Sequence, residues 1–105
     1  MSELLHIAQL LQRLGGKRYH EFLRVPAMSA GIYVLSAGAT DSQTPHKEDE
    51  IYYVVRGNAK MRLGREEREV READVIFVEA GLEHRFFDIA EELVLLVIFA
   101  PAESS

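Results

Sequence analysis

The sequence predicts an all-β protein, a barrel or jelly roll of mainly antiparallel strands with one short helix at its N-terminus. Beyond residue 16, short runs rich in Val, Ile, Tyr and Phe are broken by turn residues at intervals typical of all-β sandwiches and barrels. Only a few residues separate most of these runs, whereas parallel α/β folds need a helix between successive strands. A barrel limits exposed sheet edges and can enclose a site among its inward-facing side chains.

The N-terminal segment 3–14 carries apolar residues at helical spacing. Ser2 is positioned to cap the start of this helix, and Gly15-Gly16 to end it. We expect an amphipathic helix that packs on the core of the domain or on a dimer mate. The apolar positions are Leu4, Ile7, Ala8, Leu11 and Leu14.

Eight runs are candidate strands, and Arg56-Gly57-Asn58 and Leu63-Gly64-Arg65 are expected turns between them. The last run is apolar on both faces, so we expect one face to meet the barrel interior and the other the helix or a partner. The polar tail 103–105 is expected to fray. The candidate strands are Tyr19–Val25, Gly31–Ala37, Ile51–Val55, Ala59–Leu63, Glu69–Arg71, Val75–Val78, His84–Asp88 and Leu93–Phe99.

Composition and charge exclude several functions. The formal net charge is -5, whereas binding to nucleic acid draws on clustered Lys and Arg, so no nucleic-acid partner is expected. The chain has no cysteine, so any metal must be held by His and oxygen ligands. Neither a signal peptide nor a long apolar run is evident, so we expect no membrane contact and a cytoplasmic location.

The length of 105 residues predicts a single domain over 1–105. We expect residues 1–17 to form the helix and a linker, and residues 18–100 to form the barrel. A domain of this size buries roughly 60 to 70% of its unfolded surface, so its own core gives modest stability. A homodimer interface would add to this stability.

Three residues form a candidate metal site. His46 and Glu50 lie four apart at a loop-to-strand junction, and His84 lies near the start of a later strand. Two imidazoles and one carboxylate hold divalent iron while leaving coordination positions open, and the same ligands accept zinc, manganese or nickel. The alternative is a barrel in which both histidines only satisfy hydrogen bonds.

Two motifs around these residues resemble those of the cupin superfamily. The first, residues 38–57, reads GATDSQTPHKEDEIYYVVRG, and its His46 and Glu50 stand at the family's second histidine and its glutamate. The second, residues 73–88, reads ADVIFVEAGLEHRFFD, and its His84 stands at the family's last histidine. Gly38, Gly57 and Gly81 fall at family glycines.

The resemblance implies a small single-domain cupin, whose fold is a double-stranded β-helix or jelly-roll barrel. It further implies a divalent metal bound by His46, Glu50 and His84, and a homodimer. Thr44 stands where the family usually has its first histidine, which leaves part of the metal shell to water, substrate, or an oxygen of Gln43 or Thr44.

Further ligand or pocket candidates follow from the same motifs. Glu48 is either an additional ligand or a solvated acid in the charged run 47–49. Residues two apart in a strand share a face, so Tyr52 joins Glu50, and Phe86 joins His84. Val54 and Asp88 are expected to continue these two faces. Tyr52 and Phe86 are therefore pocket candidates.

Two functions are consistent with this site. Cupins include metal-dependent dioxygenases, sugar isomerases and epimerases, and lyases, so the resemblance implies an enzyme whose metal acts on a small molecule. No residue identifies the reaction, although Tyr52 and Glu48 are the nearest groups for acid–base chemistry. The alternative is a module that binds or senses a small, sugar-like ligand without turnover, and a third possibility is a purely structural barrel.

Overall fold

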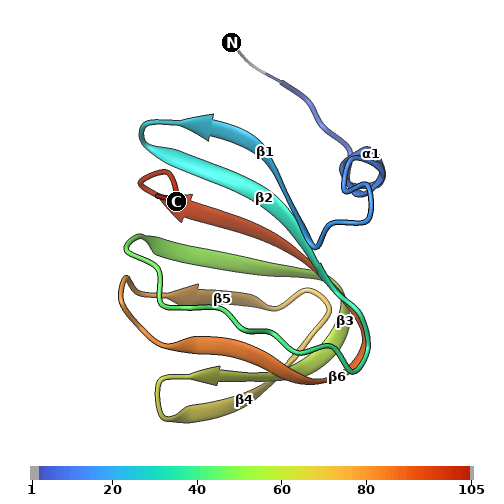
Figure 1. The fold of residues 1–105 in the computed structure, drawn as a ribbon, viewed down its shortest axis with the longest axis vertical. Helices are drawn as coiled ribbons and strands as arrows, with labels where there is room; N and C mark the ends of the chain where they lie inside the picture. Colours follow the sequence, from blue (N-terminus) through green and yellow to red (C-terminus); the bar gives the residue numbers. More distant parts are fainter. Residues whose placement is uncertain (1–2, 105) are drawn as a thin grey trace.

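The computed structural model describes residues 3–104 and contains one short helix and six strands. Each strand pairing is antiparallel (Figure 1). The predicted all-β class with a short N-terminal helix is confirmed. In chain order the elements are α1 (Ile7–Gln12), β1 (Tyr19–Val25), β2 (Met28–Leu35), β3 (Asp49–Leu63), β4 (Glu66–Arg71), β5 (Val75–Val78) and β6 (His84–Ala100).

Two long strands, β3 and β6, organise a single bent sheet. They pair along their whole lengths, from Asp49 opposite Ala100 to Leu63 opposite His84. The sheet order is β1-β2-β6-β3-β4, and β5 pairs with the first half of β3, where Glu50 lies opposite Val78. Both long strands bend near their middles (Figure 1), so the sheet curls around its inner face.

The bend is made by irregular pairing and not by the turns expected from the sequence. The expected turn at Arg56-Gly57-Asn58 lies inside β3, where the register with β6 shifts three times between Val54 and Lys60. Gly57 has the positive φ that was expected, 99°, and a Cβ there would also clash with the carbonyl oxygen of Glu92. The runs 84–88 and 93–99 likewise join into one strand, β6. Glycine at positive φ serves both turns and bulges, so the sequence alone did not separate them.

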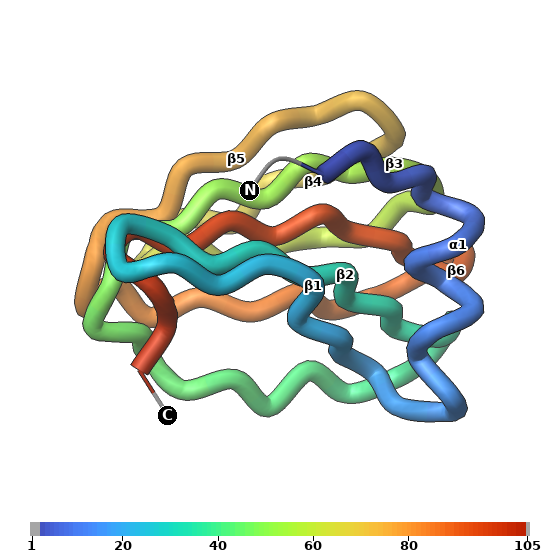
Figure 2. Tube along the Cα trace, turned by 90° about the horizontal axis from the view of Figure 1, so that it is seen from above, coloured from blue at the N-terminus to red at the C-terminus, as the bar shows by residue number. Residues whose placement is uncertain are grey.

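Helix α1 is shorter than predicted and covers part of the outer face of the sheet. The Nδ1 atom of His6 caps it by accepting from the backbone N–H of Ala8 at 3.2 Å, and the predicted cap, Ser2, lies outside the described residues. Buried Leu10 packs with Ile32 of β2 and Val94 of β6. Leu4, expected on the apolar face, is 93% exposed. Figure 2 shows α1 at one end of the sheet and the C-terminus toward the other.

The inner face of the sheet carries the core. Along β3, Glu50, Tyr52 and Val54 are buried and alternate with the exposed Ile51 and Tyr53, as the strand periodicity predicted. On β6 the alternation changes at Asp88, which was expected to face inward. Asp88 has φ 47° and is exposed, and Ile89 is buried in its place. The inner side chains of the last run are Leu93, Leu95, Val97 and Phe99.

A long irregular segment, residues 36–48, connects β2 to β3 without helix or strand. In Figures 1 and 2 it runs along the side of the sheet and ends at the start of β3. Its last residues bring His46 next to Glu50. Within residues 3–104, no helix is long and apolar enough to span a lipid bilayer.

Candidate metal centre

His46, Glu50 and His84 meet inside the bent sheet. Each offers one ligand atom, and these atoms all lie within 4.8 Å of one another. The pairing of β5 with β3, which puts Val78 opposite Glu50, and the turn from β5 to His84 bring them together. Gly81, with φ 81°, donates its backbone N–H to the carbonyl oxygen of His46 at 2.8 Å, which ties the turn before His84 to the segment that carries His46.

The Glu50 carboxylate lies between the two imidazoles. Its Oε1 is 3.2 Å from His84 Nε2 and 3.9 Å from His46 Nε2. Both carboxylate oxygens are buried and have no hydrogen-bond partner among residues 3–104. An anion buried without donors is costly, and a divalent cation between these groups would satisfy it. The three side chains therefore form a group that could hold a metal.

His84 is oriented for such a role by the backbone. Its Nδ1 lies 2.9 Å from the carbonyl oxygen of Leu82, which can only accept, so Nδ1 carries a proton and the Nε2 atom faces Glu50. Metal-ligating histidines are held in this way by an acceptor at the other ring nitrogen. Burial acts to lower the pKa of His84, but Glu50 and the Leu82 carbonyl outweigh it, so the pKa is raised.

Gln43 places an amide oxygen beside the triad. Its Oε1 accepts from the Tyr52 hydroxyl at 2.9 Å and lies 3.2 Å from His46 Nε2. Thr44, the other oxygen candidate, is exposed. Of the two oxygen candidates, Gln43 is therefore the one whose oxygen lies beside His46.

Asp41 holds Gln43 in this orientation and was not identified from the sequence. Its buried carboxylate accepts from Gln43 Nε2 at 2.8 Å, from the Tyr33 hydroxyl at 2.7 Å and from the backbone N–H of Phe86 at 2.9 Å. In the sequence, one aspartate in an irregular segment has the signature of an ordinary turn residue. Only the tertiary structure shows its three donors.

The remaining candidates lie in different surroundings. Glu48 is buried and accepts from the Ser104 hydroxyl at 2.8 Å, so its interpretation as a solvated acid is wrong, and it lies outside the group of three. Phe86 is buried and packs edge-to-face against Tyr52, with ring centroids 5.0 Å apart. Burial and the Glu50 carboxylate raise the pKa of Tyr52, so its hydroxyl stays protonated.

A cavity of about 170 Å³ opens beside the triad. Apolar and phenolic side chains form most of its wall, and two carboxylates face into it. Five of these residues lie outside both motifs, which is why the sequence did not indicate them as cavity residues: Tyr19, Tyr33, Val97, Phe99 and Glu103. The cavity is lined by Tyr19, Tyr33, Gln43, His46, Glu50, Tyr52, Val97, Phe99 and Glu103.

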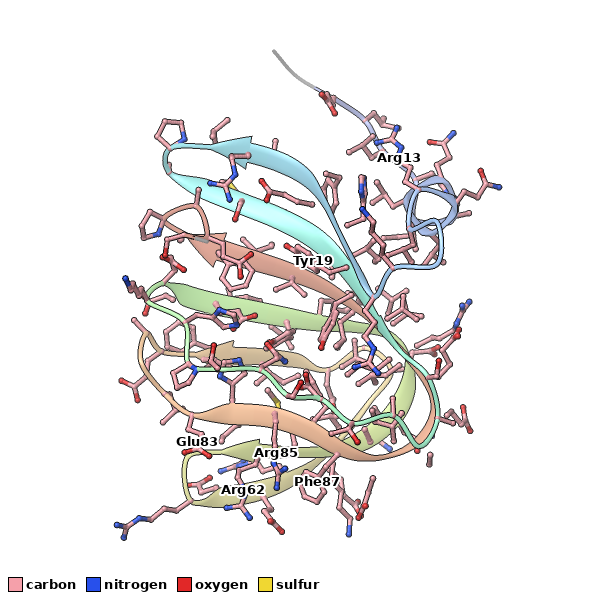
Figure 3. All side chains as sticks on the ribbon, in the orientation of Figure 1. Arg13, Tyr19, Arg62, Glu83, Arg85 and Phe87 are labelled. Carbon is pink, nitrogen blue, oxygen red and sulfur yellow. The ribbon has the colours of Figure 1, made fainter. Side chains whose placement is uncertain are left out.

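Tyr19, labelled in Figure 3, reaches from β1 across β2. Its ring lies over Gly31, where a Cβ would be 2.2 Å from the Tyr19 Cζ and hydroxyl oxygen. The hydroxyl is buried and has no hydrogen-bond partner in the described part of the chain. Burial, followed by the charge of Glu103, raises the pKa of Tyr19. The hydroxyl is therefore a protonated donor without an acceptor at the cavity wall.

The tail, which was expected to fray, closes one side of the cavity. Glu103 Oε2 lies 3.5 Å from His46 Nδ1, and the backbone N–H of Glu103 donates to the Ser29 hydroxyl at 2.8 Å. The expectation was therefore wrong for Glu103 and Ser104, while Ser105 lies outside the described residues. Burial raises the pKa of Glu103 and His46 opposes this, with Glu50 and Glu48 adding to the rise.

A bent antiparallel sheet that carries a His/Glu/His group on its inner face defines a cupin-type barrel. A cupin domain model matches residues 31–99, and the chain belongs to this family. The predicted resemblance is thereby confirmed. A relative from Streptomyces coelicolor, the uncharacterized protein SCO3923, is 49% identical over 86 residues, which cover 82% of this chain and 82% of that protein.

Solved structures share the fold at lower identity. TT1209 from Thermus thermophilus superposes with a TM-score of 0.78 and 24% identity, covering 96% of this chain and 99% of that one. KdgF from Halomonas sp. gives a TM-score of 0.72 and 21% identity over 79% of this chain and 76% of that one. Both likenesses concern the fold alone.

Proposed function

We propose that the protein binds a divalent metal ion through His46, Glu50 and His84 and uses it to bind or transform a small molecule in the adjoining cavity. The observation that carries this proposal is the Glu50 carboxylate, which is buried between two imidazoles with no hydrogen bond to either oxygen within residues 3–104. Zinc, manganese, iron and nickel all accept this ligand set. The metal would polarise a ligand oxygen as a Lewis acid or act as a redox centre.

The cavity supports a compact ligand. Its volume of about 170 Å³ corresponds to about six water molecules at about 30 Å³ each. Val97 and Phe99 provide apolar walls, and the free hydroxyl of Tyr19 provides a donor. We infer that the ligand combines an apolar side with an oxygen acceptor that faces Tyr19. Among the family's activities, dioxygenase, isomerase or epimerase, and lyase reactions on such a molecule are the candidates.

A second candidate is a module that binds or senses a small, sugar-like ligand without turnover. The hydroxyl of Tyr19 favours it, because a protonated phenol without a partner in residues 3–104 can donate a hydrogen bond to a ligand oxygen. A screen of the metal-loaded protein against phenolic, diketone and sugar substrates, following oxygen consumption and product formation, separates the candidates. Turnover of any substrate supports the enzyme; binding without turnover across the metals tested supports the module.

Elemental analysis tests the metal itself. The protein is purified without chelator or nickel resin, alongside His84→Ala and a control, His20→Ala, which removes a histidine of β1 that does not line the cavity. We expect close to one metal ion per chain in the wild type and the control, and none in His84→Ala. A wild-type protein that holds no metal, even after incubation with each of the four ions, would refute the proposal.

We also propose that two copies of the chain pair through the outer face of β3 and β5. Ile51 lies opposite Phe77 and Tyr53 opposite Val75, and all four side chains are exposed, Phe77 by 61% and Val75 by 66%. Apolar side chains gathered on one face mark an interaction surface, and homodimer interfaces are self-complementary and more apolar than the rest of the surface. A second copy of the same face is therefore the occupant that fits.

A further inference from the structure

We propose that Glu103 is a positioning residue of the metal site, which selects the tautomer of His46 that can bind the ion. The Nδ1–H group of His46 then donates to this carboxylate, and the lone pair of Nε2 is left facing Glu50. This inference rests on the proposed metal-binding function, and it assigns a role to a residue beyond both sequence motifs.

The two ring nitrogens of His46 face different acceptors. Nδ1 lies 3.5 Å from Glu103 Oε2, whereas Nε2 lies 3.2 Å from Gln43 Oε1 and 3.9 Å from Glu50 Oε1. With a proton on Nε2, the ring donates to the Gln43 amide and its lone pair faces away from the site. With a proton on Nδ1, the ring donates to Glu103 and Nε2 is free to bind a metal.

The charge of Glu103, the nearer of the two carboxylates that face the ring, favours the Nδ1–H tautomer, whereas Gln43 and Glu50 on the other side favour Nε2–H. Hydrogen bonds to an ionised acceptor are about twice as strong as those between neutral groups, so a carboxylate competes well against the amide oxygen of Gln43. Phe99 also packs edge-to-face on His46, with ring centroids 4.9 Å apart, and limits rotation of the imidazole. The Nδ1–H form is therefore the one that Glu103 stabilises.

Several tethers hold the tail where Glu103 can reach His46. The Glu103 N–H donates to Ser29, which is fully buried, and the Glu103 carbonyl accepts from Arg24 Nη2 at 2.6 Å. Ser104 donates to Glu48 at 2.8 Å. These contacts come from β1, from β2 and from the residue just before β3, so three segments fix the backbone that carries the carboxylate.

Both histidines of the triad thus have an acceptor at Nδ1. For His84 it is the backbone carbonyl of Leu82 at 2.9 Å, and for His46 it is the Glu103 side chain at 3.5 Å. An acceptor behind a ligating histidine fixes its orientation and raises its basicity as a ligand. A side-chain acceptor can be changed by mutation without altering the backbone, which makes Glu103 the testable one of the pair.

Long-range ¹⁵N–¹H NMR of the imidazole in metal-free protein tests the tautomer directly. We expect wild-type His46 mainly as Nδ1–H and His46 in Glu103→Ala mainly as Nε2–H. Glu103→Gln keeps a neutral acceptor of the same size, so its fraction of Nδ1–H tautomer should lie between those of the wild type and Glu103→Ala. The control Glu69→Gln, an exposed glutamate of β4, should match the wild type. A wild-type tautomer that is unchanged in Glu103→Ala overturns the proposal, whether or not the protein binds metal.

Affinity for Zn²⁺, measured by competition with a chromophoric chelator, gives the second readout. Loss of an acceptor behind a ligating histidine costs about 10- to 100-fold in metal affinity, so we expect this loss in Glu103→Ala and partial recovery in Glu103→Gln. If the wild type binds no Zn²⁺, the proposed function fails and the tautomer shift alone decides the role of Glu103. If all four proteins bind Zn²⁺ equally, Glu103 has no positioning role.

Discussion

The Asp41 carboxylate accepts a hydrogen bond from the backbone N–H of Phe86 at 2.9 Å, across 45 residues of sequence. This contact joins the irregular segment 36–48 to β6, just beyond His84. The same carboxylate orients Gln43, whose amide oxygen lies beside His46 and Tyr52. One buried aspartate therefore connects the two halves of the candidate metal centre.

Asp41→Ala should lower both stability and metal affinity. Three donors lose their acceptor, and each buried polar group left unsatisfied costs about 1 to 3 kcal/mol, although relaxation and water will recover part of this. We expect a loss of about 2 to 4 kcal/mol in the free energy of unfolding, measured by urea denaturation of the metal-free protein. The control is Asp49→Ala, which removes one exposed hydrogen bond, to Ala80 N, and should cost about 1 kcal/mol or less. Equal losses in the two variants would contradict this account.

Glu50→Gln should separate metal binding from folding. An amide of the same shape removes a buried charge that lacks hydrogen bonds, so the metal-free variant should be at least as stable as the wild type. The wild type should gain about 2.7 kcal/mol when free metal reaches 100 times its Kd, and the variant should gain nothing. Thermal unfolding with and without Zn²⁺ measures both effects. Equal stabilisation by metal in the two proteins would show that Glu50 is not a ligand.

Gly57→Ala should destabilise the protein more than Gly38→Ala. Both glycines have positive φ, 99° and 75°, so alanine costs about 1 to 2 kcal/mol at either site. At Gly57 the new methyl group would also meet the Glu92 carbonyl at 2.2 Å, whereas at Gly38 nothing lies within 4 Å. The additional overpacking adds about 1 to 3 kcal/mol. Denaturant midpoints of the two variants give the comparison, and similar midpoints would argue against a close approach of β3 and β6 at this bend.

Phe77→Lys should convert a dimer into monomers. The substitution places a charge at the centre of the exposed face that we propose to pair with a second copy. Leu4→Lys, at an exposed apolar residue that precedes α1, serves as the control. Light scattering at micromolar concentration should give twice the chain mass for the wild type and the control. A wild-type protein that is monomeric at this concentration would refute the dimer proposal.

The sequence predicted the parts of the molecule that depend on local periodicity. Alternation along β3 placed Glu50, Tyr52 and Val54 on the inner face, and the motifs selected the His46, Glu50 and His84 that the structure brings together. Prediction from the sequence failed where contacts between distant segments decide the local conformation. Gly57 was expected in a turn, but it lies inside β3. Its close approach to Glu92 depends on the other long strand, β6, and so leaves no local pattern in the sequence.

The same limit applies to the surroundings of the site. The charged neighbours of Glu48 in the sequence allowed a solvated acid as well as a ligand, yet Glu48 is buried and accepts from Ser104 near the far end of the chain. Glu103 and Tyr19 line the cavity from segments that carry no motif. Polar residues with partners far away in the sequence leave no local pattern, so their roles become visible only in the folded chain.

The bare backbone at Gly31 determines how far the Tyr19 ring can sit back from the cavity. Tyr19 occupies the space that a side chain at position 31 would need, and its ring forms one wall of the cavity. A single methyl group at this position would push the phenol from its place and reshape the cavity from behind, without touching the triad. A substitution at this position of β2 therefore changes the shape of the cavity while it leaves His46, Glu50 and His84 unchanged.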